Sequence, residues 1–317
     1  MKPAFVDLLD LASERLGGAA VDANDEFFAS KDSLVKPSPP RWREDDYTDR
    51  GKWMDGWETR RRRDVTADSH DWCVIRLGVT GILKGVDVET THFKGNYPES
   101  CAIDVGDGTR ASAWREVLPR TPLNGDAHNL FTVAAAPAAS HLRLRIFPDG
   151  GVARLRAYGE VVADWDRLRR RGDVDLAAAE HGGLVVGCSD MFFGSRHNLI
   201  MPGDATHMGD GWETRRRRGP GHDWTIVRLA ANGTIRRVEV DTRHFKGNAP
   251  GACSLEGTAD DPARDRWREL LPRTPLQPHA RHCFEDGVLP IGDISHVRFN
   301  IFPDGGVGRL RLFGRPA

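Results

Sequence analysis

Apolar and polar residues alternate over short stretches of the chain, and this alternation predicts strands with one buried face. Residues 86–90 read Val-Asp-Val-Glu-Thr, and residues 142–146 read Leu-Arg-Leu-Arg-Ile. Because successive side chains of a strand point to opposite faces, each stretch places its apolar residues on one side. Pro148–Gly151 has the composition of a turn, and a further strand is expected at 154–158.

The same pattern returns in the second half of the chain, at residues 238–242 and 297–301. A helix is expected at Asp7–Leu16, with a helical turn as an option in the charged stretch 160–175. The 34 glycines and 19 prolines argue against a helical bundle. Many short strands between Gly/Pro turns predict an all-β protein built as an antiparallel sandwich, with a jelly roll as the favoured form.

Long sequence blocks occur twice, in the same order. GWETRRRR stands at 56–63 and at 211–218, and HFKGN stands at 92–96 and at 244–248. A period near 155 residues is typical of a duplicated domain rather than of a solenoid repeat. The predicted division is a first module at 1–160, a linker at 161–175 and a second module at 176–317.

Charge and composition exclude several partners. Lys and Arg total 45 against 46 Asp and Glu, so no global field attracts nucleic acid or an anionic membrane. The longest apolar candidate, Val133–Ala139, is too short to span a bilayer, and residues 1–10 lack the pattern of a secretory signal. Five cysteines without a C-x-x-C pair predict reduced thiols, and we expect a cytoplasmic protein.

Four blocks carry a family resemblance: LASERLGG at 11–18, DEFFA at 25–29, GKWMDGWETRRRR at 51–63 and HDWCVIRLG at 70–78. With the two repeated motifs, they make the chain similar to the allantoicase family over nearly its full length. The resemblance implies two tandem jelly-roll modules of galactose-binding-like type. It also implies hydrolysis of allantoate to (S)-ureidoglycolate and urea in purine degradation, by a homo-oligomer.

The arginine runs are candidates for binding the substrate carboxylate. In a strand continuing from Glu58, alternate arginines would face the same side, and a planar guanidinium binds carboxylate through two parallel hydrogen bonds. An equally simple interpretation is that carboxylates of the protein pair with them. The predicted substrate-binding arginines are Arg60 and Arg62, with Arg215 and Arg217 in the second copy.

The HFKGN motif places three polar groups two residues apart. On a strand continuing from Val88 they would share one face, where His92 could exchange protons, Lys94 could hold a carboxylate and Asn96 could orient a ureido group. The alternative is a strand edge with a turn at Gly95 and Asn96, in which the histidine is satisfied by a neighbouring backbone carbonyl. The copies in the second module are His244, Lys246 and Asn248.

Glu58 and its copy Glu213 are candidates for acid or base work, since loss of urea requires proton transfers. Flanking arginines should keep these carboxyls ionised, which favours a base or a substrate-orienting group over an acid. An ion-pair role is the alternative. Asp149 and Asp304 are assigned to turns.

No metal or cofactor is predicted, because the twelve histidines form no H-x-H or H-E-x-x-H pattern. The resulting hypothesis is a metal-independent hydrolase of allantoate. A non-catalytic jelly roll that binds a carbohydrate or another small ligand is the alternative, since fold alone does not imply function. Direct attack by water and elimination followed by hydration both remain open. So does the choice between one site in each module and one site shared between modules or subunits.

Overall fold

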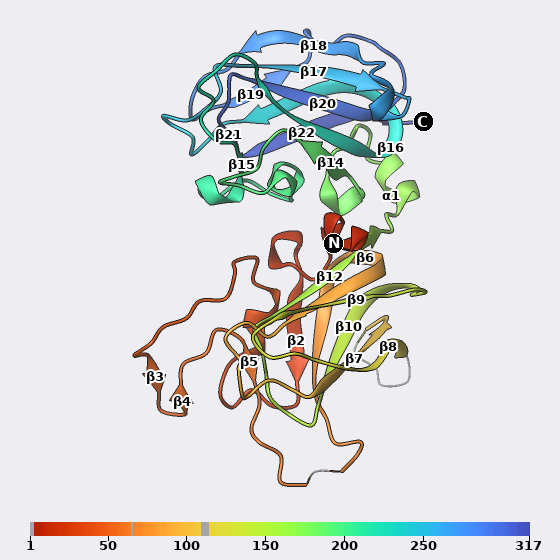
Figure 1. Ribbon diagram of the computed structural model, residues 1–317. Coiled ribbons are helices and arrows are strands. Elements are labelled where there is room, and N and C mark those ends of the chain that lie inside the picture. Colours follow the sequence, from red (N-terminus) through yellow and green to blue (C-terminus); the bar gives the residue numbers. More distant parts are fainter. Residues whose placement is uncertain (1–2, 65, 109–113) are drawn as a thin grey trace. The chain divides into compact units, whose positions relative to one another are not determined.

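The computed structural model describes residues 3–64, 66–108 and 114–317. The chain separates into two compact units, Met1–Val162 and Ala163–Ala317, called here the first and the second module. Antiparallel strands are the main regular secondary structure of both modules (Figure 1). Among the described residues, no helix has the length and apolar composition needed to cross a membrane.

The first module is built on one long strand, β6 (Asp71–Glu89), which pairs with four others. The main path of its sheet runs β1 (Leu9–Asp10), β12 (Arg154–Val161), β6, β10 (Ala138–Phe147), β7 (Ser100–Gly106) and β8 (Arg115–Pro122), while β2 (Ala19–Ala23) and β9 (His128–Thr132) pair with β6 off this path.

The two halves of β6 have different neighbours. Residues 71–76 pair with β10 and largely with β2, whereas residues 85–89 pair with β12 and β9. One strand therefore contributes to both sides of the sandwich, and apolar residues such as Ile75, Val88 and Leu144 are fully buried between them.

The second module repeats this arrangement strand for strand. Its central strand β16 (Asp223–Asp241) has the same length as β6. The path runs β13 (Val174–Asp175), β22 (Arg309–Pro316), β16, β20 (Ile294–Phe302), β17 (Ala252–Thr258) and β18 (Arg268–Pro275), with β14 (Leu184–Cys188) and β19 (Arg281–Phe284) pairing to β16. The predicted all-β fold of two tandem jelly rolls is confirmed.

Besides the two large sheets, the described residues form three small two-stranded sheets. In the first module β5 (Trp57–Glu58) pairs with β11 (Gly151–Val152), and in the second β15 (Trp212–Glu213) pairs with β21 (Gly306–Val307). A third pair, β3 (Tyr47–Thr48) with β4 (Gly51–Lys52), forms a hairpin in the first module.

The helix expected at Asp7–Leu16 was wrong. The segment holds a 3-10 turn at η1 (Ala4–Asp7), the edge strand β1 and a second 3-10 turn at η2 (Glu14–Leu16). The Asp10 carboxylate accepts hydrogen bonds from the backbone N–H groups of Ala12 and Ala157, which holds this stretch against β12 instead of letting it coil.

The other described helices are short. One α-helix, α1 (Trp165–Arg169), lies in the charged stretch, and the remaining 3-10 turns are η3 (Lys31–Val35), η5 (Ala179–His181), η6 (Arg196–Ile200), η7 (Met208–Asp210) and η8 (Pro262–Arg264). All five cysteines are free, as the sequence predicted.

Two segments expected in strands are loops. Strand β5 ends at Glu58, before the arginine run, and β6 ends at Glu89, before the HFKGN motif. The HFKGN loop is anchored by the fully buried ring of Phe93. A Cβ atom on Gly151 would lie 2.0 Å from Phe93 Cε1, so only glycine leaves room for this ring.

Candidate active site

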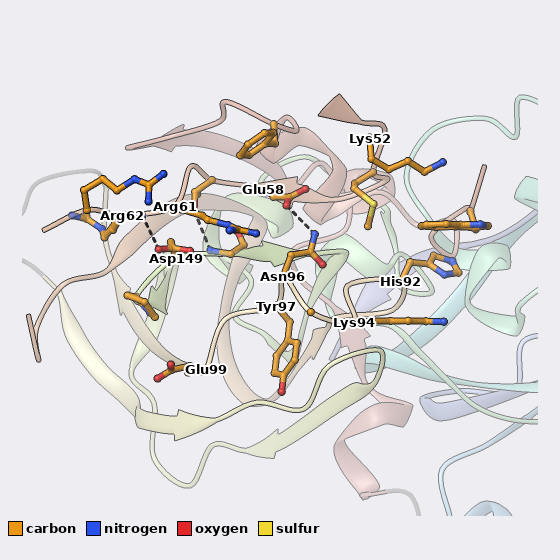
Figure 2. A pocket seen from close by; sticks show the side chains of 18 residues that line it. Lys52, Glu58, Arg61, Arg62, His92, Lys94, Asn96, Tyr97, Glu99 and Asp149 are labelled. Carbon is orange, nitrogen blue, oxygen red and sulfur yellow. Dashed lines mark hydrogen bonds between the residues drawn. The ribbon is translucent and has the colours of Figure 1, made fainter. Parts of the chain in front are cut away.

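A cavity of about 1100 Å³ opens on the first module, among loops at one end of its sandwich. Figure 2 shows the side chains that line it, several of them polar. Its walls come from Phe28, the segment that carries Trp42, Lys52 and Met54, residues 58–59 and 61–63, residues 92 and 94–97 with Glu99, and the turn 148–150.

The three polar residues of the first HFKGN motif all line this cavity. They meet through a loop rather than through a shared strand face. His92 adopts a left-handed backbone with φ of 73°, and its N–H donates to Asp126 Oδ1 at 2.8 Å. The loop is tied at its far end by Gly151 N–H, which donates to the Asn96 carbonyl at 2.8 Å. Local turns therefore bring His92, Lys94 and Asn96 to one opening.

Glu58 also lines the cavity, and Asn96 Nδ2 donates to its Oε1 at 2.8 Å (Figure 2). Burial raises the pKa of the Glu58 carboxyl, while the hydrogen bond from Asn96 and the charge of Arg61 oppose that rise. The arginine charge therefore does not lower the pKa of this carboxyl below its ordinary value, because desolvation outweighs it. A raised pKa makes the carboxyl a better partner for proton exchange near neutral pH.

The two arginines predicted to bind substrate are held by carboxylates of the protein. Arg60 does not line the cavity: its Nε donates to Asp25 Oδ2 at 2.7 Å, and its guanidinium lies 5.4 Å from the centre of the Phe27 ring. Arg62 lines the cavity, but its Nη2 lies 3.0 Å from Asp71 Oδ1. Structural ion pairing, the alternative interpretation, describes both residues.

Arg61 and Arg63 line the cavity, and the sequence reasoning left them out. The Arg61 side chain is exposed and makes no ion pair with the residues that the structure describes. Strand alternation suggested Arg60 and Arg62 because a strand was assumed. Nothing in the four arginines themselves distinguishes Arg61. The carboxylates that pair with Arg60 and Arg62 lie outside the run of arginines.

Other lining residues were missed as well. Asp149 was assigned to a turn, but it faces the cavity and accepts a hydrogen bond from the Arg62 N–H at 2.8 Å. Counting charges on the wall, five cations (Lys52, Arg61, Arg62, Arg63 and Lys94) face three carboxyls (Glu58, Glu99 and Asp149). The near-neutral chain thus contains a local cationic surface, which suits a small anion.

Within the described ranges, no group of three or more His, Cys, Asp or Glu side chains is arranged to hold a metal ion. The cavity can offer hydrogen bonds, positive charge, a titratable carboxyl and an imidazole. Those properties fit binding of a carboxylate and proton transfer to or from it or its neighbouring groups.

The second module keeps the hydrogen bond between the asparagine of HFKGN and the glutamate. Asn248 Nδ2 donates to Glu213 Oε1 at 2.7 Å, as in the first copy. Of the predicted arginines in this module, Arg215 has its guanidinium 4.3 Å from the centre of the Phe192 ring, and Arg217 pairs with Asp223. Lys246 is exposed. His244 Nε2 lies 2.9 Å from the Ala205 carbonyl oxygen.

Comparison with known proteins places both modules in one family. The allantoicase repeat model matches residues 9–162 and 174–317. A probable allantoicase of Pseudomonas paraeruginosa is 48% identical over 325 residues, which cover 98% of this chain and 97% of the relative. One of Photobacterium profundum is 45% identical over 323 residues, with 98% and 97% covered.

A solved structure agrees with these relatives. The crystal structure of allantoicase from Saccharomyces cerevisiae superposes with a TM-score of 0.85 at 33% sequence identity, and the match covers 97% of this chain and 93% of that one. Family model, sequence relatives and solved structure all extend over both modules. The chain belongs to the allantoicase family.

Proposed function

We propose that the chain hydrolyses allantoate to ureidoglycolate and urea, and that the reaction takes place in the cavity of the first module. Family membership supports the substrate. The location rests on one observation: the half-buried Glu58, with a raised pKa and an amide on its carboxylate, faces a cavity that also presents Arg61, His92 and Lys94.

The binding roles follow from the chemistry of the substrate, which carries one carboxylate and two ureido groups on the same carbon. Arg61 is the best candidate to hold the carboxylate, because its guanidinium forms no ion pair with the described part of the chain and its charge acts on the Glu58 carboxyl. Lys94 adds a second cation; its Nζ lies 4.0 Å from Asp126 Oδ2, and its side chain is 78% exposed. The Oδ1 atom of Asn96 can accept from a ureido N–H while Nδ2 stays on Glu58.

The proton transfers are assigned to Glu58 and His92. In direct hydrolysis, Glu58 takes a proton from a water molecule, and the oxygen of that water bonds to the central carbon. The C–N bond to the departing urea breaks, and His92 protonates the departing nitrogen. In the elimination route, Glu58 removes the N–H proton of the remaining ureido group, and a C=N bond forms as the C–N bond to the departing urea breaks. His92 protonates the departing nitrogen, and water then adds across the C=N bond. Both routes consume one water, and the same residues serve either.

A cytoplasmic location and assembly into a homo-oligomer stay predictions of the sequence. So do the substrate roles of Arg60 and Arg62, neither of which presents a free guanidinium to the cavity. For the carboxylate, the geometry favours Arg61.

Urea release from allantoate tests the proposal. The purified chain is expected to produce urea and ureidoglycolate in equal amounts, measured by coupled assay and by chromatography against a heat-inactivated sample. Because the proposed chemistry uses only side chains, turnover is expected to survive dialysis against a chelator. Absence of turnover at millimolar allantoate would contradict the proposal and favour a non-catalytic ligand-binding protein. Loss of turnover with chelator, restored by a divalent metal, would contradict its metal-free chemistry.

A further inference from the structure

The two modules differ in the length of one segment at the site. Between the 3-10 turn η3 and Asp55 the first module has nineteen residues, 36–54, whereas the second module has nine, 201–209, between η6 and Asp210. The segments are flanked by matching sequence, since DGWETRRRR follows both of them.

In the first module the longer segment, which carries the β3–β4 hairpin, builds a wall of the cavity. Its Trp42 ring lies 5.7 Å from the His92 ring, measured between centroids. Lys52 Nζ lies 4.9 Å from the Trp42 ring and 4.8 Å from the Tyr47 ring, and it donates to the Arg43 carbonyl at 2.7 Å. Trp42 is therefore held over His92 by contacts inside its own segment.

The His92 ring keeps its polar atoms available. Its imidazole nitrogens make no hydrogen bond with residues 3–64, 66–108 or 114–317. The Trp42 ring packs against the His92 ring at an interplanar angle of 41°, which supports one orientation of the imidazole without using a nitrogen.

In the second module the shorter segment, residues 201–209, contacts the polar atoms of the residues that correspond to His92 and Asn96. The Ala205 carbonyl oxygen lies 2.9 Å from His244 Nε2, and because a carbonyl only accepts, Nε2 must carry the proton and donate it. Met208 Sδ lies 3.8 Å from Asn248 Nδ2. Asp204 pairs with Arg243 at 2.9 Å, and Arg243 stands where the first module has Thr91. His244 is thus a histidine satisfied by the backbone of its own module.

We propose that the first module is the catalytic one, and that segment 36–54 makes it so by packing Trp42 against His92 and leaving the imidazole nitrogens for substrate. This inference rests on the proposed function. The second copy of HFKGN then has a structural role: the pair of Asn248 and Glu213 ties its loop to β15, and Phe245 is fully buried beneath it.

Two matched alanine variants test the choice of module, after turnover of the unmodified chain has been established. His92→Ala is expected to lower kcat by at least about 100-fold, and His244→Ala to leave kcat within about twofold. Thermal melting of both variants reports any loss of fold. Equal losses in the two variants, a loss in His244→Ala alone, or no loss in either would each overturn the inference. The substrate assignment itself would stand in all three cases, because it depends only on the unmodified chain.

Trp42 is a positioning residue in this scheme, and a conservative replacement separates that role from general folding. Trp42→Phe keeps an aromatic ring and is expected to retain kcat/KM within about threefold. Trp42→Ala is expected to lower kcat/KM by at least about tenfold with an unchanged melting temperature, because an imidazole out of place transfers protons poorly. Equal kcat/KM in Trp42→Ala and the unmodified chain would overturn the role of the segment. So would an equal loss in Trp42→Phe and Trp42→Ala.

Discussion

Replacement of Glu58 by glutamine is expected to lower kcat by about 10²- to 10⁴-fold, the range found when a positioned acid or base is removed. The change preserves shape, because a glutamine Oε1 can still accept the hydrogen bond that Asn96 Nδ2 donates at 2.8 Å. It removes only the ability to exchange a proton. Steady-state measurement of urea release with both proteins checks this, with melting curves to compare their stability.

The matched control is Glu213→Gln in the second module, which accepts the corresponding bond from Asn248 at 2.7 Å. It is expected to leave kcat nearly unchanged, because the same structural bond survives and the second module is assigned no chemistry. Full activity in Glu58→Gln, or an equal loss in Glu213→Gln, would contradict the assignment of the base.

The pH profile gives a second readout for Glu58. Burial raises the pKa of this carboxyl, so its ionised form, which acts as the base, is lost at a higher pH than for an ordinary glutamate. The value of kcat/KM is therefore expected to fall as the pH decreases through that raised pKa. Asn96 opposes the rise, so Asn96→Ala should move the acid limb to higher pH. A limb that stays in place in this variant would contradict the coupling.

The second large effect is expected at Arg61. Arg61→Ala should raise KM by about 10- to 100-fold, because a hydrogen bond between charged groups contributes about 1.5–3 kcal/mol. Arg61→Lys should recover part of that affinity, since it restores the charge but not the planar pair of donors. Initial rates over a range of allantoate concentrations separate the effect on KM from that on kcat.

Arg60→Ala is the control for Arg61 in the same run of four arginines. Arg60 is exposed, pairs with Asp25 and lies outside the cavity wall, so its loss should change KM little. A larger effect on KM at Arg60 than at Arg61 would restore the strand-based assignment and contradict the geometry described here.

Much of the fold could be predicted because it depends on local pattern and on repetition. Alternation around Val88 and Leu144 marked strands that are buried as expected. The duplicated blocks required two copies of one architecture, and β6 and β16 show the same pairing in each. The Asp7–Leu16 prediction failed because contacts of Asp10 with β12 outweigh local helix propensity.

The candidate site was only partly predictable, since it depends on loops. Spacing of two suggested that His92, Lys94 and Asn96 belong together, and they do line one cavity, although the loop turns at His92 with φ of 73°. The same strand rule selected Arg60 and Arg62, but β5 stops at Glu58 and Arg60 lies outside the cavity wall. The Arg60 and Arg62 carboxylate partners include Asp25 and Asp71, which no local pattern connects to the run.

Differences between the copies were also hard to read from the motifs. Both copies preserve HFKGN and the tetra-arginine run, which left open one site in each module or one site shared between modules or subunits. The difference lies in the preceding segment, where nine residues in the second module bring Ala205 onto His244 and nineteen in the first bring Trp42 onto His92. The length of this segment therefore determines whether the nitrogens of the HFKGN histidine are left without a hydrogen bond in the described part of the chain.

A crystal structure of the Glu58→Gln variant with allantoate tests the central claim most directly, because the slowed variant should hold intact substrate. Allantoate is expected in the cavity of the first module, with its carboxylate on Arg61 and a ureido group against Asn96. Allantoate bound instead around His244 and Asn248, with the cavity of the first module free of it, would contradict catalysis in the first module.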